Sequence, residues 1–129
     1  MQLKFLSVTV KDQDAALRFY TDILGFKKMA DIPMGTSRWL TVVSPDGIEG
    51  VELVLEPIDF PPAQEYQKAL FDSGKPAIAL ISKDILTDYE HLKKIGVIFH
   101  GEPHKMGLIT AVVFDDTCGN LINLVQPAA

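Results

Sequence analysis

The chain has 129 residues, which suggests a single domain over residues 1–129, and 47% of them are hydrophobic, enough for a core. No apolar run approaches the roughly 18 residues that cross a bilayer, and the N-terminus lacks the pattern of a signal peptide, so we expect a cytoplasmic protein without membrane contact. The formal net charge of −5 argues against nucleic-acid binding, and the lone Cys118 excludes an intramolecular disulfide or a cysteine-rich zinc site.

The first half of the chain predicts a strand, a helix and three further strands. Apolar and polar residues alternate from Leu3 to Val10, which is typical of a strand. Asp12 or Asp14 can cap a helix that runs to about Leu24 and ends at a glycine. The three strands that follow are expected within Phe26–Ile32, Arg38–Ser44 and Val51–Glu56.

The second half repeats this order after a linker. Within the linker, Pro61-Pro62 should interrupt regular structure and Ala63–Phe71 should form a short surface helix. The inner side of the next helix should carry Leu86, Tyr89 and Leu92, and Lys93 is a further candidate for this side. The elements expected in this half are a strand at Ala77–Ser82, the helix Ile85–Ile95, strands near Val97–Glu102, Ile109–Phe114 and Leu121–Gln126, and a final hairpin turn over residues 115–120.

The two halves form an internal repeat with a shift of 72 positions, since Asp84 repeats Asp12. We predict an α+β fold of two tandem βαβββ units (residues 1–57 and 76–129, joined by residues 58–75). They form a curved mixed eight-stranded sheet, a cup with the helices on its outer face and a ligand cavity within. The residues expected on the free face are Phe5, Ser7, Thr9, Glu52, Val54, Ala77, Ala79, Asn123 and Val125.

This pattern resembles the vicinal oxygen chelate superfamily, which includes glyoxalases, extradiol dioxygenases, fosfomycin-resistance enzymes and bleomycin-resistance proteins. The resemblance covers nearly the whole chain. It implies the paired βαβββ fold and, in the enzymes, a divalent metal bound by His and Glu side chains that chelates two adjacent substrate oxygens. The segments that carry it are Val10–Asp12, Ala16–Tyr20, Leu24–Phe26, Val51–Leu53, Leu92–Val97 and Phe114–Asn120.

The resemblance also indicates where metal ligands should lie. The family histidines fall seven residues before each helix-opening aspartate, at Phe5 and Ala77, and the last-strand carboxylates fall at Glu52 and Asn123. Only Glu52 is a ligand-type residue, and one carboxylate holds Mg²⁺ or Mn²⁺ weakly. We therefore expect no cofactor, with a divalent metal on Glu52 as the alternative.

Several residues of the predicted free face are candidate ligand contacts. Glu52 is a candidate carboxylate for a ligand or a catalytic base, with a pKa raised by desolvation. Phe5 can stack on a planar ligand, while Ser7 and Asn123 offer hydrogen bonds. Two alternatives remain for Trp39 and Arg38. In the first, Trp39 packs on an aromatic or cationic ligand and Arg38 pairs with a substrate carboxylate. In the second, Trp39 is a core residue and Arg38 faces solvent.

A second candidate cluster consists of His100, Glu102 and His104, which would share one face of a regular strand. The ends of this run would lie about 13 Å apart, which is too far for one metal unless Pro103 bends the chain. We expect instead that His104 or Lys105 contributes to the rim of the cavity.

Two functions follow from these observations. The first is a binding protein that holds a small organic molecule without the usual metal, as bleomycin-resistance proteins sequester a drug. The negative charge and Trp39 are compatible with a cationic aromatic ligand. The second is a glyoxalase-type lyase, isomerase or dioxygenase that uses Glu52 as a base or as the protein carboxylate on a metal. In either case we expect a homodimer that covers exposed sheet edges.

Overall fold

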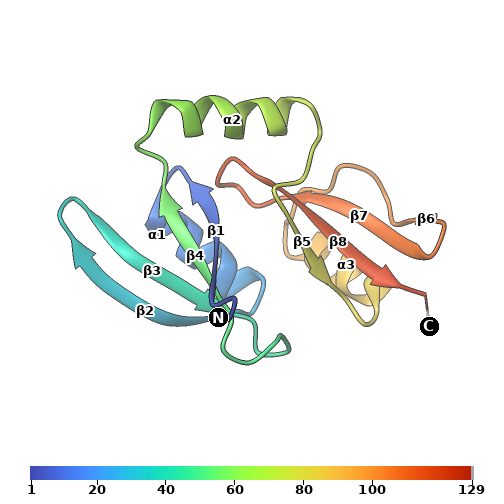
Figure 1. Cartoon of the computed structure of the whole chain (residues 1–129). Coiled ribbons are helices and arrows are strands. Elements are labelled where there is room, and N and C mark those ends of the chain that lie inside the picture. The colour runs from blue at the N-terminus through green and yellow to red at the C-terminus, as the bar shows by residue number, and fades with distance from the viewer. Residues whose placement is uncertain (129) are drawn as a thin grey trace. The chain divides into compact units, whose positions relative to one another are not determined.

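The computed structural model describes residues 1–128 and contains two four-stranded mixed sheets with three α-helices (Figure 1). One compact unit runs from Met1 to Gln67 and the other begins at Lys68. Each unit holds one βαβββ series of elements and one sheet. The predicted α+β class and the two βαβββ units are therefore confirmed, with the eight strands divided equally between the two sheets.

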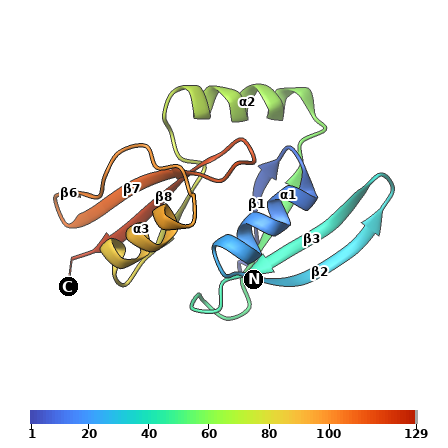
Figure 2. The ribbon, with the colours of Figure 1, turned by 180° about the vertical axis from the view of Figure 1, so that it is seen from behind.

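The first sheet has the strand order β1-β4-β3-β2, with β1 and β4 parallel and the other pairs antiparallel. Helix α1 lies across one face of this sheet (Figure 2). The elements are β1 (Phe5–Val10), α1 (Gln13–Arg18), the π-helical turn η1 (Phe19–Ile23), β2 (Lys27–Met34), β3 (Ser37–Val43) and β4 (Glu52–Pro57).

The helix of the first unit begins where the sequence predicts and changes its pitch before it ends. The Asp12 side chain caps α1 by accepting hydrogen bonds from the backbone N–H groups of Asp14 and Ala15 at 2.9 and 3.1 Å. The expected single helix to Leu24 is instead a short α-helix followed by η1. Gly25, at φ +80°, ends the segment in the left-handed region that glycine adopts without strain.

Gln13 ties α1 to two strands through a buried amide. Its Nε2 donates to the carbonyl oxygens of Arg38 at 2.8 Å and Leu55 at 2.9 Å, and its Oε1 accepts from the Arg38 N–H at 3.1 Å. Only 9% of this residue is exposed. The amide therefore satisfies backbone groups of β3 and β4 where the helix begins.

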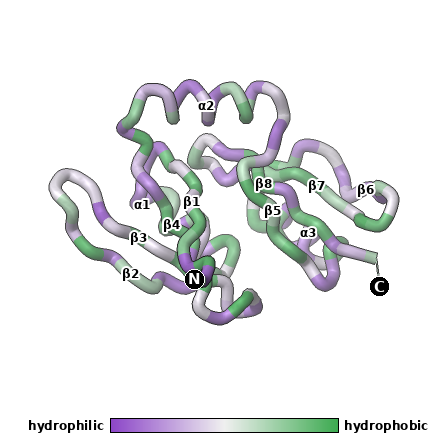
Figure 3. The backbone as a smooth tube through the Cα atoms, in the orientation of Figure 1, coloured by the Kyte–Doolittle hydropathy of each residue, from purple (hydrophilic) through white to green (hydrophobic). Residues whose placement is uncertain are grey.

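Helix α2 (Pro61–Asp72) is longer than the sequence predicts. Pro61 and Pro62 open it rather than interrupt structure, because the first helical turn needs no N–H donors and the proline ring fixes a helical φ. The helix is mostly hydrophilic (Figure 3). Its buried Gln67 donates from Nε2 to the Thr9 carbonyl at 2.8 Å, which fastens it to the end of β1. Among residues 1–128, no helix is long and apolar enough to span a bilayer.

The second sheet has the strand order β5-β8-β7-β6, with β5 and β8 parallel. Asp84 caps α3 by accepting from the Thr87 N–H at 3.2 Å. The elements are β5 (Ile78–Ile81), α3 (Ile85–Lys94), β6 (His104–Met106), β7 (Ile109–Asp115) and β8 (Leu121–Pro127).

Two predictions for the second unit are wrong. Leu86 does not lie on the inner side of α3 but is 62% exposed, because the buried stripe starts one residue earlier, at Ile85, and continues through Tyr89 and Leu92. The expected strand near Val97–Glu102 is a single bridge between Phe99 and Phe114, and β6 begins only at His104. Gly101, at φ +105°, interrupts the extended backbone between them.

The hairpin turn at residues 115–120 forms as predicted, around a buried carboxylate. Asp116 accepts hydrogen bonds from the backbone N–H groups of Cys118 at 2.7 Å and Asn120 at 3.0 Å, and from the Asn120 side chain at 2.9 Å. Thr117 has φ +63° within this turn. The carboxylate replaces the partners that these donors would otherwise find in water.

We expect Gln13→Ala to lower the free energy of unfolding by about 2 to 3 kcal/mol, because the carbonyl groups of β3 and β4 that Gln13 now satisfies would lose their hydrogen-bond donor. Gln64→Ala is the matched control, since Gln64 makes one exposed bond from α2 to the Ile58 carbonyl; its cost should stay below about 0.5 kcal/mol. Urea unfolding measures both. Equal effects of the two variants would contradict the bridging role of Gln13.

Candidate functional site

The predicted site residues of the first unit share the face of the sheet opposite α1. Phe5 pairs with Glu52 and Ser7 with Val54 in the parallel register of β1 and β4. Thr41 of β3 also pairs with Val54, so Trp39, two positions earlier, lies on the same face. We call these residues, with Lys4 beside Phe5, the open face of the first sheet.

Glu52 is buried at this face and both of its carboxylate oxygens have partners. Oε1 accepts from the Thr41 hydroxyl at 2.6 Å, and Oε2 lies 3.0 Å from the ammonium of Lys4. The hydrogen bond from Thr41, followed by the contact with Lys4, lowers the pKa of Glu52 below its ordinary value. The expectation of a raised pKa is therefore wrong, because these two donors outweigh desolvation. A carboxylate held in this way is a weak proton acceptor.

Phe5 and Trp39 form an aromatic pair on the open face. Their ring centroids are 5.2 Å apart and the ring planes are inclined by 79°, an edge-to-face contact. Phe5 is 45% exposed and Trp39 is half-buried. The position of Trp39 on this face is compatible with the alternative in which Trp39 contacts a ligand. Ser7 lies farther along β1 and donates to Glu56 Oε1 at 3.1 Å.

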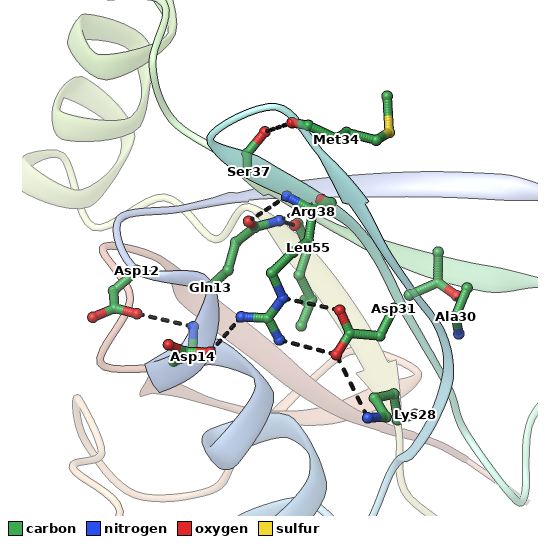
Figure 4. Close-up of polar contacts among 11 residues, drawn as sticks. Asp12, Gln13, Asp14, Lys28, Ala30, Asp31, Met34, Ser37, Arg38 and Leu55 are labelled. Atoms are coloured by element: carbon green, nitrogen blue, oxygen red, sulfur yellow. Dashed lines mark hydrogen bonds and ion pairs between the residues drawn. The ribbon is translucent and has the colours of Figure 1, made fainter.

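Arg38 points to the other side of the sheet, toward α1, where it pairs with acids of its own unit (Figure 4). Its Nε and Nη2 lie 2.9 and 3.2 Å from the carboxylate oxygens of Asp31, and Nη1 contacts Asp14. The guanidinium lowers the pKa of Asp31, mainly by hydrogen bonding. Arg38 is therefore a tie between β3, β2 and α1 and does not reach the open face.

The remaining predicted site residues lie in the second unit, where the strand register places them on one face of the second sheet. Ala77 precedes β5 and donates its N–H to the Leu121 carbonyl at 2.8 Å. Asn123 on β8 pairs with Ala79 and with Val113. His104 is an exposed residue of β6, separated from β8 by β7, and its Nδ1 lies 3.2 Å from the Glu102 carbonyl. Their role in ligand binding stays a prediction.

The side chains at the positions where the resemblance implies metal ligands do not suit a divalent metal. Phe5 and Ala77 carry no donor atom, Asn123 offers a neutral amide, and the Glu52 carboxylate already engages Lys4 and Thr41. Within residues 1–128, no three His, Cys, Asp or Glu side chains converge in a way that could hold a metal ion. His100 is directed instead toward Phe71, with ring centroids 6.1 Å apart.

Two residues of the open face escaped the sequence analysis. Thr41 was within reach, because it alternates with Trp39 on one strand and so had to share its face. Lys4 gave no such signal. It precedes β1, and strict alternation with Phe5 would have placed its side chain on the opposite face.

Comparison with known proteins identifies the family once this geometry is established. The sequence model of the Glyoxalase/Bleomycin resistance protein/Dioxygenase superfamily matches residues 2–124. The chain belongs to this superfamily. The resemblance to vicinal oxygen chelate proteins seen in the sequence is thereby confirmed at the level of the family.

Three relatives cover nearly the whole chain. The uncharacterized protein YurT of Bacillus subtilis (strain 168) is 54% identical over 126 residues, which are 98% of this chain and 99% of that protein. The crystal structure of UcmS2 has a TM-score of 0.81 at 32% identity, covering 97% of each chain. TnmS3, described as an antibiotic binding protein from Streptomyces sp. CB03234, has a TM-score of 0.78 at 30% identity, covering 99% of this chain and 97% of its own.

The lowered pKa of Glu52 predicts a pH-dependent contribution to stability. The ionised side chain contributes fully above the ordinary pKa of 4.5, and this contribution is lost as the pH falls through the lower pKa of the folded state. Measured by urea unfolding, the stability advantage of the native protein over Glu52→Gln should therefore shrink as the pH is lowered below 4.5. An advantage that grows on acidification would contradict the ion pair.

Proposed function

We propose that this protein binds a small aromatic organic molecule on the open face of the first sheet, without the family's usual divalent metal. The observation that carries the proposal is the partly exposed edge-to-face pair of Phe5 and Trp39 beside a carboxylate that already has its partners. Aromatic rings at a partly exposed surface lose little conformational freedom when a planar molecule packs on them. TnmS3, an antibiotic binding protein of the same fold at 30% identity, supports small-molecule binding.

The enzymatic alternative has less support. A lyase, isomerase or dioxygenase of glyoxalase type would need Glu52 as a base or as a metal ligand. The hydrogen bond from Thr41 and the ion pair with Lys4 make this carboxylate a poor base, and the other family ligand positions offer no strong donor. Binding without chemical conversion is the reading that these contacts favour.

Binding can be followed directly through Trp39, the only tryptophan of the chain. A panel of planar aromatic compounds should include members that shift its single indole N–H resonance. Trp39→Ala and Phe5→Ala should each lower the affinity for such a compound by about three- to tenfold, as expected for one aromatic contact. Binding to the Phe5 variant can be followed by the indole resonance, and binding to the Trp39 variant by calorimetry. Phe60→Ala, at an exposed phenylalanine elsewhere in the unit, should leave the affinity unchanged. Equal losses in all three variants would contradict a site at this pair.

The metal-free character is tested by elemental analysis of protein purified without chelators. We expect zinc, nickel, iron and manganese all well below one ion per chain, because a lone carboxylate paired with an ammonium holds such ions weakly. Glu52→Gln should leave this background unchanged. A near-stoichiometric metal content that this substitution removes would favour the enzymatic alternative.

We also infer that the protein is a homodimer in the cytoplasm. The sheet edges are formed by β1 and β2 in the first unit and by β5 and β6 in the second. The edge strand β2 exposes three large apolar side chains, and pairing with a second copy would cover them: Met29, Ile32 and Met34. Light scattering should give twice the chain mass of 14.2 kDa; a mass of one chain at micromolar concentration would contradict this inference.

A further inference from the structure

At the Phe5 end of the open face, the charge presented to a ligand is that of Lys4, not that of Glu52. Glu52 is only 8% exposed, and its two oxygens accept from Thr41 and Lys4. The Lys4 side chain is 50% exposed. An ammonium has three N–H donors, and in the part of the chain that the structure describes its one acidic partner is Glu52. The remaining donors of Lys4 are directed to solvent or to a ligand.

The ammonium also lies beside the aromatic pair. The Lys4 Nζ is 5.7 Å from the centroid of the Phe5 ring, and that ring contacts Trp39. This distance lies within the range in which a cation is attracted by an aromatic ring. Glu52 and Phe5 together restrict the ammonium to a small region at the start of β1. A planar molecule packed on the two rings would bring its edge next to this fixed positive charge.

We propose that Lys4, positioned by Glu52, is a specificity-determining residue that selects aromatic ligands carrying a carboxylate or another acidic group. This inference rests on the proposed function, because it assumes that the ligand packs on Phe5 and Trp39. It differs from the expectation of a cationic ligand, which rested on the net charge of the chain and on Trp39 and did not include the ammonium of Lys4.

A second carboxylate on the same strand fixes the direction of the ligand. Glu56 is exposed and lies four residues beyond Glu52 on β4, about 13 Å away at the rise of a strand. Its Oε1 accepts from Ser7. The acidic group of the ligand therefore lies at the Lys4 end of the open face, away from the repulsion of Glu56.

The test compares three probes of nearly equal shape, 2-naphthoate, 2-naphthamide and 2-naphthylmethylammonium, by calorimetry and by the Trp39 indole resonance. The native protein should bind 2-naphthoate most tightly and the ammonium probe most weakly. Lys4→Met should lower the affinity for 2-naphthoate by about fivefold, the size expected for one partly exposed ion pair. The affinity for 2-naphthamide should change by less than about twofold. Lys4→Arg should keep the preference for the acid, and Lys11→Met, at an exposed lysine outside the site, should change nothing.

Glu52→Gln distinguishes a positioning role of Glu52 from a purely structural one when it is compared with a control glutamate variant. Glu52→Gln should reduce the preference for 2-naphthoate over 2-naphthamide, since the ammonium is no longer held, whereas Glu65→Gln, at an exposed glutamate of α2, should leave that preference unchanged. Binding of all three probes with equal affinity, or equal losses for the acid and the amide in Lys4→Met, would overturn the role of Lys4 while leaving the aromatic site intact. Failure of every probe to bind would overturn the aromatic site itself.

Discussion

The interaction on which this account depends is the Glu52 carboxylate held between the Thr41 hydroxyl and the Lys4 ammonium. A buried carboxylate must be paired or protonated, and here the pairing keeps it ionised. Glu52 is therefore not free to bind a metal or to accept a proton, and the charged group that a ligand meets beside it is the half-exposed ammonium of Lys4. The same contacts connect β3, β4 and the residue before β1, so the pair that sets the charge of the open face also joins its strands.

The superfamily fold is compatible with both catalysis and sequestration, and the fold alone does not decide between them. The decision lies in the side chains at a few strand positions. At the two positions where the resemblance to the superfamily implies histidine in the enzymes, this chain has Phe5 and Ala77. Phe5 does more than remove a metal ligand, because its ring pairs with Trp39 and lies near Lys4.

Much of the fold was predictable, because the internal repeat and the alternation of strand residues fix the order of elements and the faces of β1 and β4. Phe5, Ser7 and Glu52 were placed on one face for this reason. Alternation could not decide which of Arg38 and Trp39 faces α1, since both are compatible with either side until Asp14 and Asp31 are placed. Lys4 was missed because it lies outside the strand, where tertiary contacts, and not the alternation of strand residues, decide the direction of a side chain.

The most direct measurement is a crystal structure of the protein grown with 2-naphthoate. The account predicts the naphthalene ring packed on Phe5 and Trp39, with its carboxylate within hydrogen-bond distance of the Lys4 ammonium and Glu52 still bound to Thr41. A ligand whose acid group points away from Lys4, or a metal ion coordinated by Glu52 in place of that ammonium, would contradict it.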